Sequence, residues 1–229
     1  MINIKNIQNS EKRQNDVFQE KPKERFRMPK LYYQGHGSFR LTSNNGLVIY
    51  VDPYAGDGYD IPADIILVSH QHDDHNKIEL APQKEDCVIF TNEEAIEAGC
   101  HMTLHLDDDD SVTARAVEAH NKNHDNTQCV GFIITIDGVK IYASCDTSRT
   151  KQMETFADLS LDYAILCGDG IYNMDLEEAA ECARLIGAKH NIIIHIKPGA
   201  LFDRERAEAW DAPNKLIIEP GQEIELMEK

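Results

Sequence analysis

Long apolar stretches, including one that could form a signal-peptide core, and paired cysteine motifs are not found in this sequence. No run of apolar residues approaches 18, so we expect no membrane-spanning helix. The first 30 residues contain no apolar segment that could form the core of a signal peptide. The 6 cysteines are scattered without a Cys-x-x-Cys pair, which is typical of reduced thiols rather than a disulfide framework. These absences predict a cytoplasmic protein with no membrane partner.

Basic residues are also scarce. The chain has 23 Lys and Arg against 40 Asp and Glu, giving a formal net charge of −17. Nucleic acids and anionic membranes bind through basic patches, so we expect no nucleic-acid partner. A small anionic substrate held by a metal ion is not excluded. The hydrophobic content of 41% is enough for a folded core.

The 229 residues suit one domain or two small ones. Residues 1–30 form a polar, basic N-terminal extension in our interpretation, because they lack a sustained apolar period and contain 8 Lys and Arg against 4 Asp and Glu. A short amphipathic helix over 15–27 is one option there. Residues 31–229 show neither a repeat nor a low-complexity linker. We therefore predict a single domain over 31–229.

Short β-rich segments dominate the first two thirds of that domain, and a β-α-β-α-β order follows. Asn45-Gly46 and Asp137-Gly138 predict hairpin turns. Asp175 is expected to cap a helix over 175–187 with Glu178 completing a capping box, and Gly187 is expected to end it. Further helices are predicted over 92–99 and 203–210, and strands over 31–34, 38–42, 46–52, 64–69, 86–90, 112–118, 129–136, 139–144, 161–167, 191–196, 215–219 and 223–227. The pattern predicts mixed sheets with helices outside.

Four potential metal ligands follow the apolar strand over 64–69. His70, His72, Asp74 and His75 lie within six residues. Imidazole and carboxylate groups suit zinc and similar metals. Two histidines at i and i+2 on extended chain point to one side and can hold one ion, while Asp74 and His75 can face a second. A histidine-rich surface loop is the alternative, but this spacing after a buried strand is a demanding pattern.

The motif His-x-His-x-Asp-His after a hydrophobic strand resembles the hallmark of the metallo-β-lactamase superfamily, and the resemblance covers nearly all of 31–229. That family has an α+β fold, a four-layer αββα sandwich. Segments at 35–39 (GHGSF), 51–54 (VDPY) and 172–175 (YNMD) look like the branch of small metal-dependent hydrolases related to ascorbate-6-phosphate lactonase. The resemblance implies a metal site at one edge of two sheets.

The resemblance also implies the remaining ligands. One ion would be held by His70, His72 and His120. The other would be held by Asp74, His75 and His195, with Asp146 shared between the two ions. Asp52 matches a family aspartate that braces the ligand loop.

Three positions leave alternatives open. His124 rivals His120, which we prefer because it follows a strand directly. Cys145 replaces the family's usual glycine before the shared aspartate and either fills the core or approaches the metals. His36 is either a core histidine or a group that contacts the substrate or a metal-bound water.

We therefore expect a binuclear metal-dependent hydrolase that uses two divalent ions, zinc or else manganese. A metal-bridging hydroxide would attack a small ester, lactone, amide or phosphodiester. Asp146, Asp74 and His36 are the catalytic candidates, and His36, His124 or solvent would protonate the leaving group. The expected partners are a small-molecule substrate and, from the resemblance, further copies of the chain. A nuclease of the same fold and a non-catalytic metal-binding regulator are the alternatives.

Overall fold

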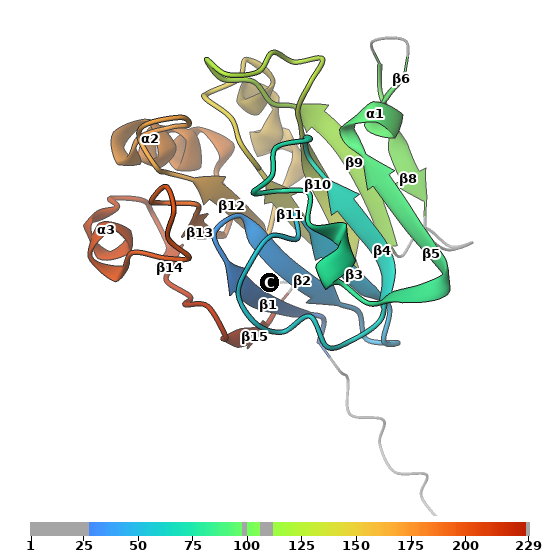
Figure 1. Ribbon diagram of the computed structural model, residues 1–229. Helices are drawn as coiled ribbons and strands as arrows, with labels where there is room; N and C mark the ends of the chain where they lie inside the picture. Colours follow the sequence, from blue (N-terminus) through green and yellow to red (C-terminus); the bar gives the residue numbers. More distant parts are fainter. Residues whose placement is uncertain (1–27, 98–99, 106–111, 228–229) are drawn as a thin grey trace, which may run out of the picture.

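The computed structural model describes residues 28–97, 100–105 and 112–227, and it contains two β-sheets packed face to face (Figure 1). The first sheet has six strands in the order β15-β1-β2-β3-β4-β5. Strands β3 and β4 are parallel, and so are β4 and β5. The strands span Lys30–Gly35 (β1), Ser38–Thr42 (β2), Val48–Val51 (β3), Ala63–Val68 (β4), Gln83–Thr91 (β5) and Glu223–Glu225 (β15).

The second sheet has seven strands in the order β14-β13-β12-β11-β10-β9-β8. Strands β11 to β14 are parallel, and β8 to β11 are antiparallel. The strands span Thr103–His105 (β8), Val112–Glu118 (β9), Val130–Ile136 (β10), Val139–Ala143 (β11), Tyr163–Cys167 (β12), His190–Ile194 (β13) and Lys215–Leu216 (β14). A separate small hairpin joins Ile96–Glu97 (β6) to Cys100–His101 (β7).

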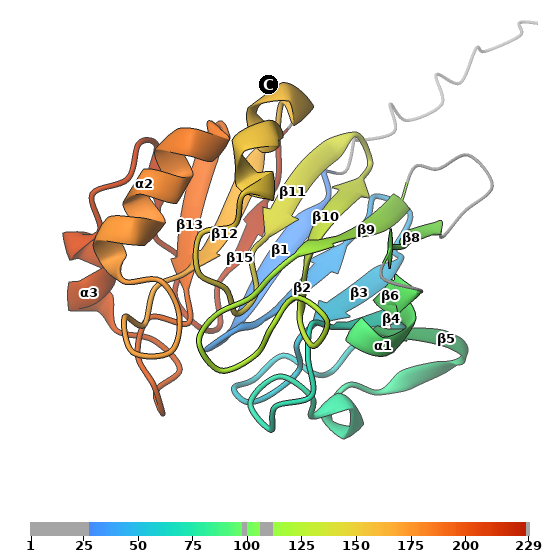
Figure 2. The same ribbon diagram turned by 90° about the horizontal axis from the view of Figure 1, so that it is seen from above.

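The main core lies between the two sheets, because one face of each strand carries apolar side chains. Leu41 and Val51 of the first sheet belong to the same buried cluster as Phe132 and Ile165 of the second. A second cluster covers the outer face of the seven-stranded sheet, where Trp210 is fully buried. The helices Leu176–Ile186 (α2) and Arg204–Ala209 (α3) and the 3-10 helix Gln152–Leu159 (η2) supply this outer layer, as Figure 2 shows.

The outer face of the six-stranded sheet is covered more thinly. Tyr50 and Ile66 form a small buried cluster there, with Tyr59 and Ile78 packed against it. In the described part of the chain this layer consists of loops and the 3-10 helix Ile78–Leu80 (η1). The predicted α+β sandwich is confirmed, with one of its two helical layers reduced to a turn and loops.

Several local predictions need correction. The helix expected over 92–99 is only Asn92–Ala95 (α1), because Ile96–Glu97 pairs with Cys100–His101 instead. Asp175 does cap α2, but Glu178 forms no capping box, since its carboxylate accepts a hydrogen bond from the backbone N–H of Arg149 at 2.8 Å. The helix suggested over 15–27 lies outside the described residues, and the division at residue 30 stays a prediction. None of the helices that the structure describes has the length and apolar character needed to cross a membrane.

The parallel strands determine where the chemistry lies. Parallel strands present their carboxyl ends at the same edge of a sheet. The residues that follow β3, β4, β11, β12 and β13 include Asp52, His70, Asp146, Asp169 and His195. The two sheets therefore deliver imidazole and carboxylate groups to one edge of the sandwich.

Candidate metal centre

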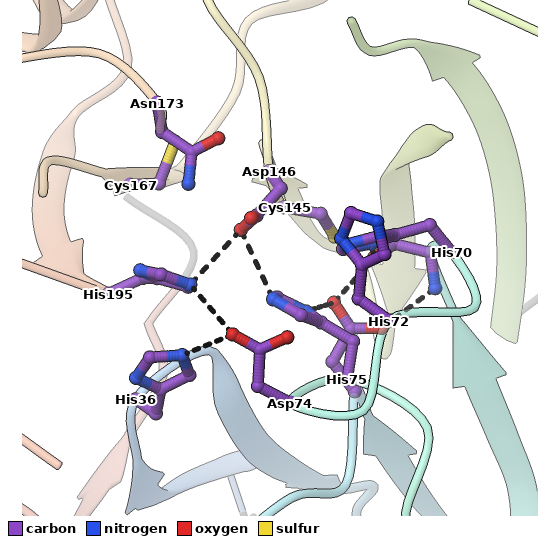
Figure 3. Close-up of polar contacts among 12 residues, drawn as sticks. His36, His70, His72, Asp74, His75, Cys145, Asp146, Cys167, Asn173 and His195 are labelled. Atoms are coloured by element: carbon purple, nitrogen blue, oxygen red, sulfur yellow. Dashed lines mark hydrogen bonds and ion pairs between the residues drawn. The ribbon is translucent and has the colours of Figure 1, made fainter. Parts of the chain in front are cut away.

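Side chains from both sheets meet at this edge (Figure 3). The loop after β4 contributes His70, His72, Asp74 and His75, and the chain after β11 and β13 contributes Asp146 and His195. All of these were predicted site residues, and the fold brings them together from positions up to 125 residues apart in the sequence.

Asp146 is the centre of the cluster. Its Oδ1 atom lies 3.3 Å from His75 Nε2 and 3.4 Å from His195 Nε2. All three side chains are buried, and none of these three atoms has a hydrogen-bond partner. Leaving buried polar atoms unpaired is costly unless another group satisfies them. These two nitrogens and one oxygen therefore converge on a point that a cation would occupy after displacing the proton of His75.

Asp74 and His36 lie beside this point. Asp74 Oδ2 is 3.1 Å from His36 Nε2 and 3.9 Å from His195 Nε2. The other nitrogen of His36 is 3.2 Å from the carbonyl oxygen of Ala200, and the residue is only 2% exposed. His36 is thus held against Asp74 rather than directed to solvent, an arrangement that favours a positioning role over delivery of a proton.

His124, and not His120, joins the other side of the cluster. The ring centroid of His124 lies 4.8 Å from that of His70 and 5.6 Å from that of His72. His124 Nδ1 is buried without a partner. The groups of close ligand atoms among the described residues include neither His120, whose backbone is bonded to Thr147 and Ser148, nor His72. His72 Nδ1 does lie 3.0 Å from His70 Nε2. The preference for His120 is therefore not supported by the geometry.

A turn centred on Asn121 explains this difference. Asn121 Oδ1 accepts hydrogen bonds from the N–H groups of Asn123 and His124, and the N–H of Asn121 donates to the carbonyl of His124. The loop after β9 therefore folds back and returns His124 to the histidine cluster. An asparagine three residues before a histidine is the sequence signal for such a turn.

Asp52 braces the ligand loop, as the family resemblance implied. Its carboxylate accepts hydrogen bonds from the backbone N–H and the hydroxyl of Ser69, both at 2.7 Å. Its Oδ2 atom also lies 2.9 Å from His75 Nδ1, which leaves Nε2 of that ring facing Asp146. A carboxylate behind a ligating histidine fixes the orientation and tautomer of the ring.

Asp169 plays the matching part for His195, and the sequence reasoning missed it. Asp169 Oδ2 lies 3.5 Å from His195 Nδ1, and Oδ1 accepts the N–H groups of Ile171 and Tyr172. The sequence did contain a signal for it. Asp169 lies two residues after β12, and β12 pairs in parallel with β13, the strand that precedes His195.

A chain of side-chain hydrogen bonds joins the two halves of the cluster. Asn173 Nδ2 donates to Asp169 Oδ2 at 2.8 Å, and Asn121 Nδ2 donates to Asn173 Oδ1 at 2.7 Å. Asn121 Nδ2 also lies 3.1 Å from His124 Nε2. The hydrogen-bonded path therefore runs from Asp169 to His124, and Asp169 contacts His195 at 3.5 Å without a hydrogen bond.

The backbone is unusual at the same place. His36, Asp52, Cys145 and His195 all have φ between 46° and 55°, the left-handed region that non-glycine residues rarely occupy. Such conformations are found where the surrounding structure enforces them, frequently at functional sites. At Cys145 this explains why a glycine is usual there in the family that the sequence resembles.

Burial and neighbouring charges shift the pKa values of the cluster in different directions. Burial and the charge of His75 lower the pKa of His70 to about 2. Burial alone would lower the pKa of His75, but the carboxylates of Asp146 and Asp52 outweigh it and raise that pKa. Burial alone would raise the pKa of Asp146, but His75 and His195 hold it well below the usual value. The metal-free cluster therefore has an ionised Asp146, a neutral His70 and a protonated His75.

These donors fit a divalent metal. The unpaired buried atoms are imidazole nitrogens and a carboxylate oxygen, the ligand set of zinc and related ions. One close group joins His70 and His124 to the buried thiol of Cys129, and another joins Asp74, His75 and His195 to His36. A third group, of His70, His75 and Asp146, lies between them.

Comparison with known proteins agrees with this fold. A model described as the β-lactamase superfamily domain matches residues 30–195. A protein named a metal-dependent hydrolase in Thermococcus onnurineus is 26% identical over 87% of this chain and 100% of its own. A candidate metal-dependent hydrolase of Parabacteroides distasonis, with a crystal structure, is 29% identical over 83% of this chain and 93% of its own, with a TM-score of 0.67. Igni18, a metallo hydrolase of Ignicoccus hospitalis, shares the fold at 21% identity, with a TM-score of 0.70 over 88% of this chain and 100% of that one.

The fold and the metal-ligand cluster define a metal-dependent hydrolase of the metallo-β-lactamase type. The chain belongs to the β-lactamase superfamily domain family, as its sequence motif predicted.

Proposed function

We propose that the protein hydrolyses a small ester, lactone, amide or phosphodiester with two divalent metal ions. The observation that carries this proposal is the convergence of unpaired, buried His75 Nε2 and His195 Nε2 on Asp146 Oδ1. One ion would be held by His70, His72 and His124. The other would be held by Asp74, His75 and His195, with Asp146 between the two.

When bound, such ions supply Lewis acidity, which makes water a nucleophile at neutral pH and polarises the substrate oxygen. The side chains of the protein supply orientation. Asp146 stays ionised and can accept a hydrogen bond from the attacking water. His36 holds Asp74, and Asp52 and Asp169 hold His75 and His195. Because His36 and His124 are both buried, we propose that the leaving group takes its proton from solvent.

Zinc is the metal that we propose, with manganese as the alternative, since imidazole and carboxylate ligands accept both. The acid excess of the chain favours a small-molecule substrate over a nucleic acid. A cytoplasmic location and an assembly of several copies stay predictions.

The test combines metal analysis with hydrolysis. Purified protein should contain up to two divalent ions per chain and should hydrolyse generic lactone or phosphodiester substrates. Chelation should abolish the activity, and zinc or manganese should restore it. Asp146→Asn should be inactive. His190→Ala is the control and should keep its activity, because His190 lies outside the cluster and stacks on Tyr163. Full activity of the metal-free protein would refute the proposal.

A further inference from the structure

A cavity opens directly beside the histidines on one side of the metal centre. His70, His72 and His124 form one wall. The remaining lining residues are polar, namely Gln71, Asn92, Glu93, Asn123, Thr127 and Gln128. The cavity volume is about 390 Å³, within the range of small-molecule sites. A substrate whose reacting group lies at the metals can therefore extend into this space.

The lining contains no Lys or Arg among the described residues that form it. The ammonium group of nearby Lys122 is directed elsewhere, 5.9 Å from the ring centroid of Tyr172. Sites that bind phosphate or carboxylate groups place Arg or Lys against them. Glu93 adds a negative charge at the rim, so an anionic substituent would be disfavoured here.

A cationic substituent is also disfavoured. Glu93 is the one acidic residue among the described lining residues, and its side chain is exposed. An ion pair with an exposed carboxylate contributes little to binding. Both signs of charge are therefore poor matches for this cavity.

Amide side chains are the dominant feature of the lining, and buried Asn92 bonds the side chain of Gln71 and the backbone of Gln128. Asn92 Oδ1 accepts a hydrogen bond from Gln71 Nε2 at 2.8 Å, and Asn92 Nδ2 donates to the carbonyl of Gln128 at 3.0 Å. Asn92 thus ties the loop after β4 to the loop before β10. Gln128 Oε1 accepts from the N–H of Asp125, and no partner for its Nε2 group is found among the described residues. A primary amide offers both donors and acceptors, as hydroxyl groups require.

We infer that this cavity receives an uncharged, hydroxyl-bearing part of the substrate, whose ester or lactone group lies at the metal centre. The inference rests on the proposed function for the reacting group, but the binding of the hydroxyl-bearing part can be measured without turnover.

The kinetic test uses three lactones that differ only in their substituents. Glucono-δ-lactone carries neutral hydroxyls, 6-phosphogluconolactone adds an anion, and δ-hexalactone has no polar substituent. We expect kcat/KM of the zinc-loaded protein to be highest for glucono-δ-lactone. Gln128→Leu should raise KM for that substrate about 5-fold, the value of one or two neutral hydrogen bonds, and should leave δ-hexalactone unchanged. Gln83→Leu, an exposed glutamine on β5, is the matched control and should change neither.

A second kinetic test changes the charge of the cavity and measures which lactone is preferred. Gln128→Arg should shift the preference toward 6-phosphogluconolactone, because it introduces the missing cation. A wild-type protein that prefers the phosphorylated or the apolar lactone would overturn the inference while leaving the hydrolase proposal intact.

If no lactone is hydrolysed, that result counts against the proposed reaction alone. A binding experiment then tests whether the cavity receives a hydroxyl-bearing group. Saturation-transfer NMR should detect sorbitol bound to the zinc-loaded protein, and Gln128→Leu should weaken that signal while Gln83→Leu should not. An absence of sorbitol binding, or equal binding by all three proteins, would overturn the inference.

Discussion

His120 and His124 lie in the same polar loop, yet their backbones are bonded in ways that give them different surroundings. The N–H and carbonyl groups of His120 are bonded to Thr147 and Ser148, whereas the turn at Asn121 folds His124 back to His70. A sequence pattern that ranks histidines by their distance from a strand cannot detect this turn. The fold therefore places His124, the alternative left open in the sequence, beside His70, and its role as a metal ligand stays a prediction.

Replacing each of the two histidines separately by alanine tests which one binds the metal. His124→Ala should lose about one metal ion per chain, because it removes a nitrogen that faces His70. His120→Ala should keep the full metal content. Metal analysis of the dialysed proteins measures both, with circular dichroism to establish that each variant is folded. Loss of metal from His120→Ala alone would show that the assignment is wrong.

His75 makes metal binding depend on pH. The carboxylates of Asp146 and Asp52 raise its pKa, so its ring is protonated in the metal-free protein. A metal ion must displace that proton, and a lower pH should therefore weaken binding. Calorimetric titration with zinc in buffers of different ionisation enthalpy should detect proton release, and the release should diminish in Asp52→Asn. Binding without proton release at pH 6 would contradict this account.

The backbone of Cys145 has a φ of 50°, and its side chain is partly buried. Left-handed backbone costs an L-residue about 1 kcal/mol relative to glycine. Comparison of two variants isolates this cost, since both remove the thiol. In urea titrations of the metal-free protein, the free energy of unfolding of Cys145→Gly should be about 1 kcal/mol larger than that of Cys145→Ala. Equal stabilities would mean that the backbone there is not strained.

At the scale of elements, the parallel strands β11, β12 and β13 place Asp146, Asp169 and His195 at one sheet edge. The apolar strands were visible in the sequence, since each is a short buried run between polar turns. Their spatial order was not, because residues far apart in the chain form the register, such as Cys167 opposite Ile194. Asp169 was overlooked for this reason.

Asp169→Asn should weaken metal binding by about 10- to 100-fold, as expected when the group behind a ligating histidine is altered. The new amide would place a donor against Asn173 Nδ2, or would remove the negative charge that lies 3.5 Å from His195 Nδ1. Asp162→Asn is the control, because Asp162 is a buried aspartate that pairs with Lys189 outside the cluster. Competition titrations with a zinc chelator measure the affinities. Equal affinities of the two variants would exclude a positioning role for Asp169.

At the scale of the whole molecule, the metal centre joins the two sheets. Its ligands come from loops of both, and the unpaired atoms at Asp146 lie where the sheets meet. An ion that binds the folded chain but not the unfolded chain stabilises it by about 2.7 kcal/mol at a concentration 100 times its Kd. Relief of the unpaired buried atoms is part of that binding free energy.

Metal removal should therefore lower the melting temperature by roughly 5–10 °C, on the scale expected for a domain of about this size. Differential scanning calorimetry with and without a chelator measures the change, with chelator already saturated by calcium as the control. The shift should be smaller in His124→Ala, which starts with less metal. An unchanged melting temperature would show that the sheets do not depend on the ions.

The sequence by itself determined the α+β class, most of the strands, the cap and end of α2, and the superfamily, because these depend on local periodicity and on a compact ligand motif at 70–75. Only the tertiary structure placed His124 beside His70, revealed Asp169 and Asn173 behind the cluster, and opened a polar cavity without Lys or Arg beside them. Those features depend on which loops meet at the sheet edge. Contacts between residues distant in the chain are set by packing of the two sheets, which no local pattern encodes.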